Sequence, residues 1–267
     1  YKVVAEFLTN EGKKFKASLP KNFDTKEEAL AFLNSSKAAS FKVEDLQKKP
    51  AEKFPAAPFT TSTLQQEASR KLYFPVAKTM MIAQRLYEAG LITYMRTDSV
   101  NLSQEAINGA KAQILSEYGE NYSKPRNYTT KSSSAQEAHE AIRPTDFSVK
   151  TVGDAQLNKL YQLIYRRTLA SQMENAKIEK TVIEIGNPKL PQHFEAQGEV
   201  IIFDGFLKAY GIVKTEDDDD DSNEKLLPKV KVGEILDYKT ITATEKFTKP
   251  AARFTEAGLV KKLEELG

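Results

Sequence analysis

Two stretches of strand-like sequence enclose a helical middle, and this order constrains the fold more than any other feature of the chain. Residues 1–20 alternate apolar and polar side chains on either side of Asn10-Glu11-Gly12, which predicts a hairpin. A further strand is expected over 41–46, and strand patterns return after residue 178, over 181–185, 199–203 and 235–241. The predicted fold class is therefore α+β and multidomain, with a helical domain inserted into a discontinuous β-rich domain.

Helical signals occupy the middle of the chain. Residues 60–90 predict two helices split at Phe74-Pro75, with Thr61 or Ser62 as the first cap and Gly90 after the second helix. Such a pair resembles a helix-turn-helix, although helical hairpins are generic packing units. Three more helices are expected, from a cap at Asp24 or Thr25, from Ser103 to Tyr118 and from Asp154 to Met173. The Ser/Thr-rich residues 121–135 are expected to form a mobile loop.

Composition shifts and prolines suggest where the domains end. Pro50, Pro55 and Pro58 mark a boundary between the first β-rich part and the helical part. The acidic run 216–221 repels itself, so a solvated loop is favoured over a metal site. The predicted division is a β-rich part (1–54), a helical domain (55–177), a second β-rich part (178–247) and the start of another helical domain (248–267).

Several functional classes are made improbable by what the chain lacks. It has no cysteine and two histidines, so neither a disulfide nor a thiolate zinc site can form within it. No apolar run reaches the ~18 residues of a membrane span and no secretory segment opens the chain, so we expect a cytoplasmic protein without a membrane partner. A net charge of +2 is no strong indication of nucleic-acid binding. The chain begins at Tyr1, and we expect it to be an internal piece of a longer protein.

Tyr94 is the candidate nucleophile of the chain. A phenol with a pKa of about 10 attacks poorly at neutral pH, so it needs a neighbouring cation or a metal-assisted partner. Arg96 supplies a cation two residues away, and in an extended segment both side chains project from the same side. One guanidinium could then serve the phenol and a phosphate oxygen, which points to a phosphodiester target. The alternative is an ordinary tyrosine of a half-buried strand, one of 11 in the chain.

Three blocks of sequence carry a resemblance to a known family. They occur in order as PFTTSTLQQ (58–66) with KTMM (78–81), QRLYEAG (84–90) and NLS (101–103), then QEAHEAIRP (136–144), then FTKPAARFTE (247–256). This pattern, together with Tyr94 and Arg96, resembles the bacterial type IA DNA topoisomerases over essentially the whole chain. The resemblance implies a helical gate domain that carries the tyrosine and two β-rich halves that form an arch.

The same resemblance implies a reaction and its partners. Tyr94 would cleave single-stranded DNA through a 5′-phosphotyrosyl link, and strand passage followed by religation would relax negatively supercoiled DNA in the bacterial nucleoid. The chain has no Gly-rich loop ending in Gly-Lys-Ser/Thr, in agreement with a reaction that uses no ATP. In the family, Mg²⁺ is held by a Toprim domain that nothing in this chain matches. We therefore expect no metal ligands in the chain itself, and partners in the Toprim and C-terminal domains of the same polypeptide.

The matching blocks supply further candidate site residues. His139 stands in a helix-like segment that ends at Arg143-Pro144. It would lie near the scissile phosphate, and Glu140 could orient it or pair locally. Arg143 either contacts phosphate or pairs with a carboxylate. Thr97 and Asp98 either fix Arg96 from behind or cap the next element. The remaining candidates for phosphate contact, with solvated surface charges as the alternative, are Lys249 and Arg253.

Two other functions stay open. The chain could act as a single-stranded DNA-binding or gate module without catalysis, because the metal-binding carboxylates of the family are expected elsewhere. A helix-turn-helix regulator of duplex DNA is less favoured, since neither helix of the pair over 60–90 is a clustered basic recognition helix.

Overall fold

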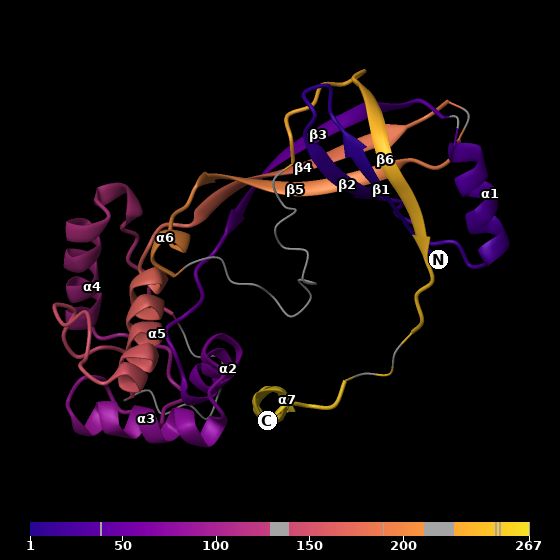
Figure 1. Cartoon of the computed structure of the whole chain (residues 1–267). Helices are drawn as coiled ribbons and strands as arrows, with labels where there is room; N and C mark the ends of the chain where they lie inside the picture. The colour runs from indigo at the N-terminus through magenta and orange to yellow at the C-terminus, as the bar shows by residue number, and fades with distance from the viewer. Residues whose placement is uncertain are drawn as a thin grey trace. The chain divides into compact units, whose positions relative to one another are not determined.

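The structure, a computed structural model, describes residues 1–37, 39–128, 139–188, 190–210, 227–248, 250 and 252–266. The chain divides into two compact units, each built from segments that are distant in the sequence (Figure 1). The β unit contains residues 1–52, 177–203 and 214–250. The helical unit contains residues 53–176, 204–213 and 251–267. A mixed α/β architecture with an interrupted β part is thus present.

Six strands of the β unit close into a barrel in the order β1-β2-β5-β4-β3-β6. They are β1 (Lys2–Leu8), β2 (Lys14–Ser18), β3 (Phe41–Lys53), β4 (Ala176–Gly186), β5 (Phe194–Phe203) and β6 (Ile235–Thr244). β1 and β2 pair antiparallel with Phe7 opposite Phe15, which confirms the predicted hairpin. Alternate side chains of β1 are buried, so one face of each strand lines the core.

Aromatic rings fill the barrel. The Phe7 ring makes edge contacts with Phe41 and Phe194 at centroid distances of 5.4 and 5.5 Å. Phe41 also contacts Tyr238 of β6 at 5.8 Å. These rings come from four different strands, so together they hold the barrel closed by burial of apolar surface. Helix α1 (Lys26–Ser36) packs against β6.

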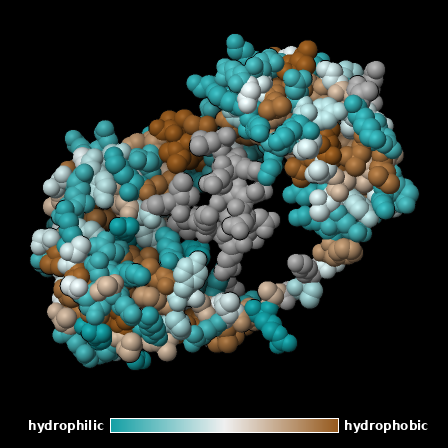
Figure 2. Space-filling view, viewed as in Figure 1, coloured by the Kyte–Doolittle hydropathy of each residue, from teal (hydrophilic) through white to brown (hydrophobic). Residues whose placement is uncertain are grey.

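The helical unit is organised around α5 (Ala155–Ser171), whose residues Leu160, Tyr161 and Ile164 are fully buried. The other helices are α2 (Thr61–Leu72), α3 (Val76–Glu88), α4 (Gln104–Glu117), the short 3₁₀ helix η1 (Glu120–Tyr122), α6 (Leu207–Tyr210) and α7 (Glu256–Leu266). Helices α2, α3, α4 and α6 contact α5, and α7 contacts α2. On the visible face of this unit, apolar residues lie in small areas among polar ones, because its large apolar side chains point inward (Figure 2).

Local capping chemistry explains most helix ends. Thr25 forms a reciprocal capping box with Glu28. Ser103 and Asp154, where helices were predicted to begin, are the N-caps of α4 and α5. Gly90 adopts φ +71° just after α3 and donates its N–H to the Tyr87 carbonyl at 2.8 Å, as expected for a glycine that ends a helix. The first cap of α2 was predicted one or two residues too late. Thr60 is the cap, because its hydroxyl and that of Thr63 bond reciprocally to the two backbone N–H groups.

Several predicted boundaries need correction. Strand β3 continues past Pro50 to Lys53, and its side chains over 48–53 are exposed or only partly buried. Residues 121–128 are held rather than loose, because the Arg126 N–H donates to the Gln172 side chain at 2.9 Å and its guanidinium donates to Asn175 at 2.6 Å. The rest of the predicted loop, residues 129–135, and the acidic run 216–221 lie outside the described residues.

Two segments belong to a different unit from the one the sequence suggested. Residues 204–210, predicted as part of the second β-rich part, contain α6 and pack in the helical unit. Residues 252–266, predicted as the start of another domain, contain α7, whose Glu256 carboxylate accepts from the Val76 N–H at 3.2 Å. The other predicted boundaries, after residues 54 and 177, lie within two residues of those between the units. None of the helices in the described ranges has the length and apolarity needed to cross a membrane.

Candidate active site

Tyr94 lies in an irregular, bent segment between α3 and α4 rather than in a regular strand. Side chains along it alternate in burial: Met95, Thr97 and Ser99 are buried, whereas Tyr94, Arg96 and Asp98 are exposed. Tyr94 keeps 44% of its surface accessible. The phenol and the guanidinium are therefore both available to a ligand, as the predicted alternation required.

One aromatic neighbour touches the Tyr94 ring. Tyr87, in the last turn of α3, meets it edge to face at a centroid distance of 5.2 Å and an interplanar angle of 65°. Such pairs stabilise one ring orientation by roughly 0.5–1.5 kcal/mol. The contact leaves both tyrosines partly exposed, so it restricts the ring without covering it.

A threonine before Tyr94 ties the segment to residues 139–145. The Thr93 N–H donates to the Arg143 carbonyl at 2.9 Å, and the Arg143 N–H donates to the Thr93 hydroxyl at 2.9 Å. The same hydroxyl donates to the Ala141 carbonyl at 2.7 Å. The two sequence blocks that suggested the site are therefore joined through their backbones directly next to the tyrosine.

A second threonine holds the segment on the other side. Thr61, the first residue of α2, donates its hydroxyl to the Met95 carbonyl at 2.8 Å and to the Thr97 carbonyl at 3.1 Å. This hydroxyl also accepts from the Thr97 N–H at 2.8 Å. Sequence reasoning considered Thr61 only as a cap, and no local pattern reveals a bond that spans 36 residues.

Residues 139–144 do not form the predicted helical segment. They run extended, with isolated bridges from Ile142 to Phe59 and from Pro144 to Ile92. The prediction was wrong because these long-range backbone bonds replace the local ones that a helix would use. His139 is exposed at the beginning of this stretch.

Glu140 binds two groups other than His139. Its carboxylate accepts from the Ser103 N–H at 2.6 Å and from the Arg143 guanidinium at 2.7 Å. Burial alone would raise the pKa of this carboxyl, but the hydrogen bonds from Ser103 and Arg143 bring its pKa below the ordinary value. Of the two alternatives for Glu140, the structure shows local pairing, which anchors the start of α4.

Arg143 is half of that ion pair. Its side chain is only 13% exposed, and the guanidinium also donates to the Pro144 carbonyl at 2.9 Å. The structure therefore shows the carboxylate-pairing alternative, while contact with phosphate stays a prediction. The buried Nε atom of Arg143 has no hydrogen-bond partner within the described ranges.

The remaining candidates are more loosely placed. The Thr97 hydroxyl accepts from the Ser99 N–H at 3.0 Å, which is the turn-capping alternative. Asp98 and Arg253 are exposed. Lys249 lies outside the described residues. Roles of these side chains in DNA contact, or of Asp98 in fixing Arg96, stay predictions.

A buried charged cluster in the helical unit escaped sequence reasoning. The Glu67 carboxylate on α2 accepts from the Tyr210 hydroxyl at 3.0 Å and pairs with Lys71 at 3.2 Å and with Arg70. Arg167 donates to the same Tyr210 hydroxyl at 3.2 Å. Burial opposes ionisation, but the cations around Glu67 bring its pKa below the ordinary value. The cluster fastens α6 to α2 and α5, and its partners are too far apart in the sequence to be paired by pattern.

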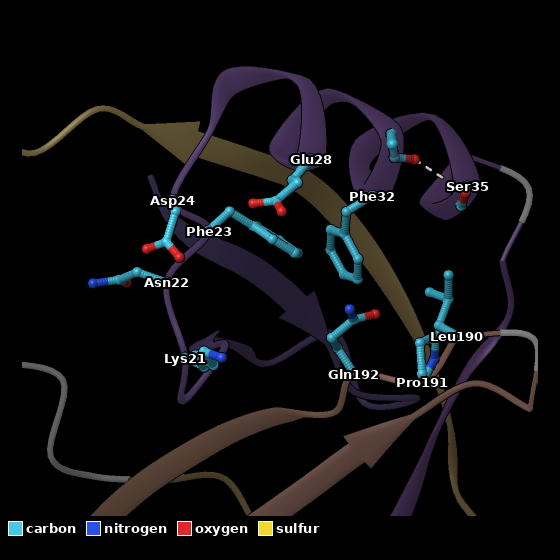
Figure 3. Close-up of a pocket in the computed structure, with 11 residues that line it drawn as sticks. Lys21, Asn22, Phe23, Asp24, Glu28, Phe32, Ser35, Leu190, Pro191 and Gln192 are labelled. Carbon is cyan, nitrogen blue, oxygen red and sulfur yellow. Dashed lines mark hydrogen bonds between the residues drawn. The ribbon is translucent and has the colours of Figure 1, made fainter.

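The β unit contains a pocket of about 530 Å³ beside α1 (Figure 3). Phe23, Phe32 and Leu190 form its apolar part, and its charged lining residues are Asp24, Glu28 and a single cation, Lys21. Two carboxylates against one ammonium repel a phosphate backbone. This pocket is therefore a poor candidate for DNA binding, and the Tyr94 segment is the better site.

Comparison with known proteins identifies the class of protein that this fold and site define. A family model described as DNA topoisomerase matches residues 1–267. The chain belongs to this family, in its bacterial type IA branch.

Individual relatives agree. DNA topoisomerase 1 of Zymomonas mobilis is 43% identical over 251 residues, which cover 91% of this chain and 20% of the relative. DNA topoisomerase 1 of Streptomyces coelicolor is 47% identical over 237 residues, covering 84% of this chain and 25% of the relative. The solved structure of full-length topoisomerase I from Thermotoga maritima superposes with a TM-score of 0.80 at 31% identity, covering 100% of this chain and 44% of that chain. The chain thus spans about a fifth to a quarter of the two curated relatives.

Proposed function

We propose that Tyr94 is the nucleophile of a type IA topoisomerase reaction on single-stranded DNA. The observation that carries this proposal is an exposed tyrosine beside an exposed arginine, on a segment whose backbone is anchored on both sides by the hydroxyls of Thr93 and Thr61. Anchoring of this kind is what an active site needs, because reacting groups must be held in a productive geometry before the substrate arrives.

In the proposed cleavage step, the Tyr94 Oη attacks the phosphorus of a phosphodiester. A bond forms from the phenol oxygen to phosphorus, and the bond to the 3′ oxygen breaks. The phenol proton is lost, and the leaving oxygen takes up a proton to become a 3′-hydroxyl. The product is a 5′-phosphotyrosyl link, and attack by the 3′-hydroxyl reverses the step. One phosphodiester replaces another, so the bond energy is kept and the reaction needs no ATP.

Arg96 is proposed to stabilise the charge that develops on the phosphoryl oxygens. A guanidinium presents a planar fork of donors that matches two oxygens at once, and such charge stabilisation is commonly the largest contribution to catalysis. His139, exposed at the start of the joined segment, is proposed as a second donor to phosphate when protonated. Lys249 and Arg253 are proposed as more distant DNA contacts.

Mg²⁺, which the family resemblance implies, has no fitting site among the residues that the structure describes. Across the residues that the structure describes, no group of three or more His, Asp or Glu side chains could hold a metal ion. We propose that a Toprim domain of the same polypeptide supplies the metal, that the helical unit is the gate and the β unit the arch, and that strand passage relaxes negative supercoils.

A cleavage and mapping experiment tests the nucleophile. The full-length protein is incubated with a single-stranded oligonucleotide labelled at either end, denatured and digested, and the modified peptide is sequenced by mass spectrometry. We expect DNA attached through its 5′ phosphate to the peptide that contains Tyr94, with a free 3′-hydroxyl on the other product. Attachment to a different tyrosine, or through a 3′ phosphate, would contradict the proposal.

The second candidate is a DNA-binding gate module without chemistry. Exposed Tyr94 and Tyr87 could stack on bases, since stacking on aromatic rings requires no reaction. In that case the protein would retain DNA on a native gel, and the denatured sample would contain no covalent adduct.

A further inference from the structure

We propose that Thr61 is a positioning residue for Arg96. This inference rests on the proposed function, in which the Arg96 guanidinium meets the scissile phosphate. Thr61 contacts the backbone on both sides of that arginine: its hydroxyl lies 2.8 Å from the Met95 carbonyl oxygen and 2.8 Å from the Thr97 nitrogen. Its own N–H donates to the Thr97 carbonyl at 2.9 Å.

This arrangement matters because the Arg96 side chain is exposed, so its direction depends on the backbone from which it projects. Within the described ranges, no hydrogen bond or ion pair of its guanidinium is found. The direction in which a long side chain leaves the main chain depends on the φ and ψ of its own residue. By bonding to both neighbours of Arg96, one hydroxyl restricts both peptide planes that define those angles.

The anchor is itself rigid. Thr61 begins α2, whose first turn is closed by the reciprocal bonds of Thr60 and Thr63 at 2.9 and 3.2 Å. Phe59, two residues before Thr61, is fully buried and bridges to Ile142. Sites supported by helices are held more accurately than sites on free loops. Thr61 therefore fixes the irregular segment around Arg96 to the first turn of α2.

Residues closer to Arg96 in the sequence do not show this geometry. Thr97 uses its hydroxyl to accept from the Ser99 N–H, which shapes the turn that follows. Asp98 is exposed. The restraint on Arg96 thus comes from a residue 35 positions earlier in the chain.

Removing the hydroxyl of Thr61 tests the proposal. Thr61→Val keeps the shape and the backbone N–H, but leaves the Met95 carbonyl and the Thr97 N–H without this partner. In the full-length protein we expect covalent adduct formation to slow about tenfold, while affinity for a single-stranded oligonucleotide changes less than about threefold. Thr61→Ser restores the hydroxyl and is expected to restore most of the cleavage rate.

Two controls separate positioning from stability. Thr168→Val removes a fully buried hydroxyl that donates to the Ile164 carbonyl at 3.0 Å within α5, and it should leave cleavage unchanged once melting curves show that the protein is folded. In an Arg96→Lys background, Thr61→Val should have a clearly smaller effect, because the fork that it orients is already lost. Equal effects in the two backgrounds would overturn the proposal, and so would a Thr61→Val protein that cleaves normally.

The outcomes also distinguish the two layers of inference. Adducts that still form in Tyr94→Phe would contradict the proposed function, and they would contradict the role of Thr61 as well. If Tyr94→Phe forms no adduct and the effects of Thr61→Val and Arg96→Lys multiply independently, only the positioning role is wrong. If Thr61→Val does not fold, Thr61→Ala and Thr61→Ser are compared in its place, and a Ser variant as slow as Ala contradicts the proposal.

Discussion

The β unit and the helical unit are held together by different kinds of interaction. In the β unit, Phe7, Phe41 and Phe194 meet within regular strands, and the barrel is closed by backbone pairing and ring burial. The helical unit also has an apolar core, but its candidate site lies on irregular backbone tied down by the hydroxyls of Thr61 and Thr93. The comparison suggests that regular packing supplies stability, whereas hydroxyl-anchored irregular segments supply the geometry for chemistry.

The largest effect should come from deleting one oxygen in the helical unit. Tyr94→Phe removes the proposed nucleophile from a side chain that is 44% exposed, so we expect no detectable covalent DNA adduct and an unchanged melting temperature. Denaturing gels with labelled single-stranded DNA provide the measurement. Tyr87→Phe, which keeps the neighbouring ring, is the matched control and should still form the adduct.

A core deletion in the β unit should show the opposite behaviour. Phe41 is fully buried and touches Phe7, Phe194 and Tyr238, so Phe41→Ala is expected to lower the free energy of unfolding of the β unit by about 3–5 kcal/mol. Chemical denaturation followed by tyrosine fluorescence would report the loss. Adduct formation per folded molecule should stay normal, and a loss of cleavage at full folding would break the division between the units.

Arg96→Lys tests whether the site needs shape or only charge. The lysine keeps the positive charge and loses the planar fork, so we expect cleavage to fall about 10- to 100-fold while single-strand affinity changes little. Affinity should retain its salt slope, because many dispersed phosphate contacts contribute to it. Normal cleavage by the lysine variant would mean that charge suffices, and equal losses of binding and cleavage would make Arg96 a docking residue.

A smaller, stabilising effect is expected at the turn between α2 and α3. Tyr73 is the single non-glycine residue with positive φ in the part of the chain that the structure describes, at +55°, and its side chain is 87% exposed. Tyr73→Gly relieves the left-handed strain and should stabilise the helical unit by up to about 1 kcal/mol, as measured by thermal unfolding. Tyr73→Ala keeps the Cβ atom and should not stabilise. Cleavage should be unaffected by either change.

The smallest effect concerns the pH dependence of Glu140. Its pKa in the folded protein lies below the ordinary value of 4.5, despite partial burial, because Ser103 and Arg143 bond to the carboxylate. Stabilisation by a lowered pKa is fully present above the unfolded pKa and is lost as the pH falls through the folded one. The melting temperature of Glu140→Gln should thus lie below that of the unchanged protein at neutral pH. The gap should narrow as the pH falls below the ordinary value of 4.5 and close once the pH is below the folded pKa. A gap that stays constant would show that the ion pair adds no stability.

Periodicity and capping signals were sufficient to predict most elements of both units. The β1–β2 hairpin, the capping residue Thr25 and the end of α3 at Gly90 all depend on residues within a few positions of one another. Their free energies are set by local backbone preferences and by one apolar face, which leave a pattern that a single sequence reveals. The motif that contains Tyr94 and Arg96 likewise identified the candidate nucleophile and its cation without coordinates.

Tertiary structure alone decided how that site is held. The stretch from His139 to Arg143 was predicted as helical, but it is extended because Ile142 and Arg143 bond to Phe59 and Thr93, which are 50 or more residues away. The bonds of Thr61 to the backbone beside Arg96 span 34 and 36 residues, and the bond between Glu67 and Tyr210 spans 143. A hydrogen bond between distant residues imposes no repeat on the sequence around either partner, so only the folded chain shows which hydroxyl meets which carbonyl.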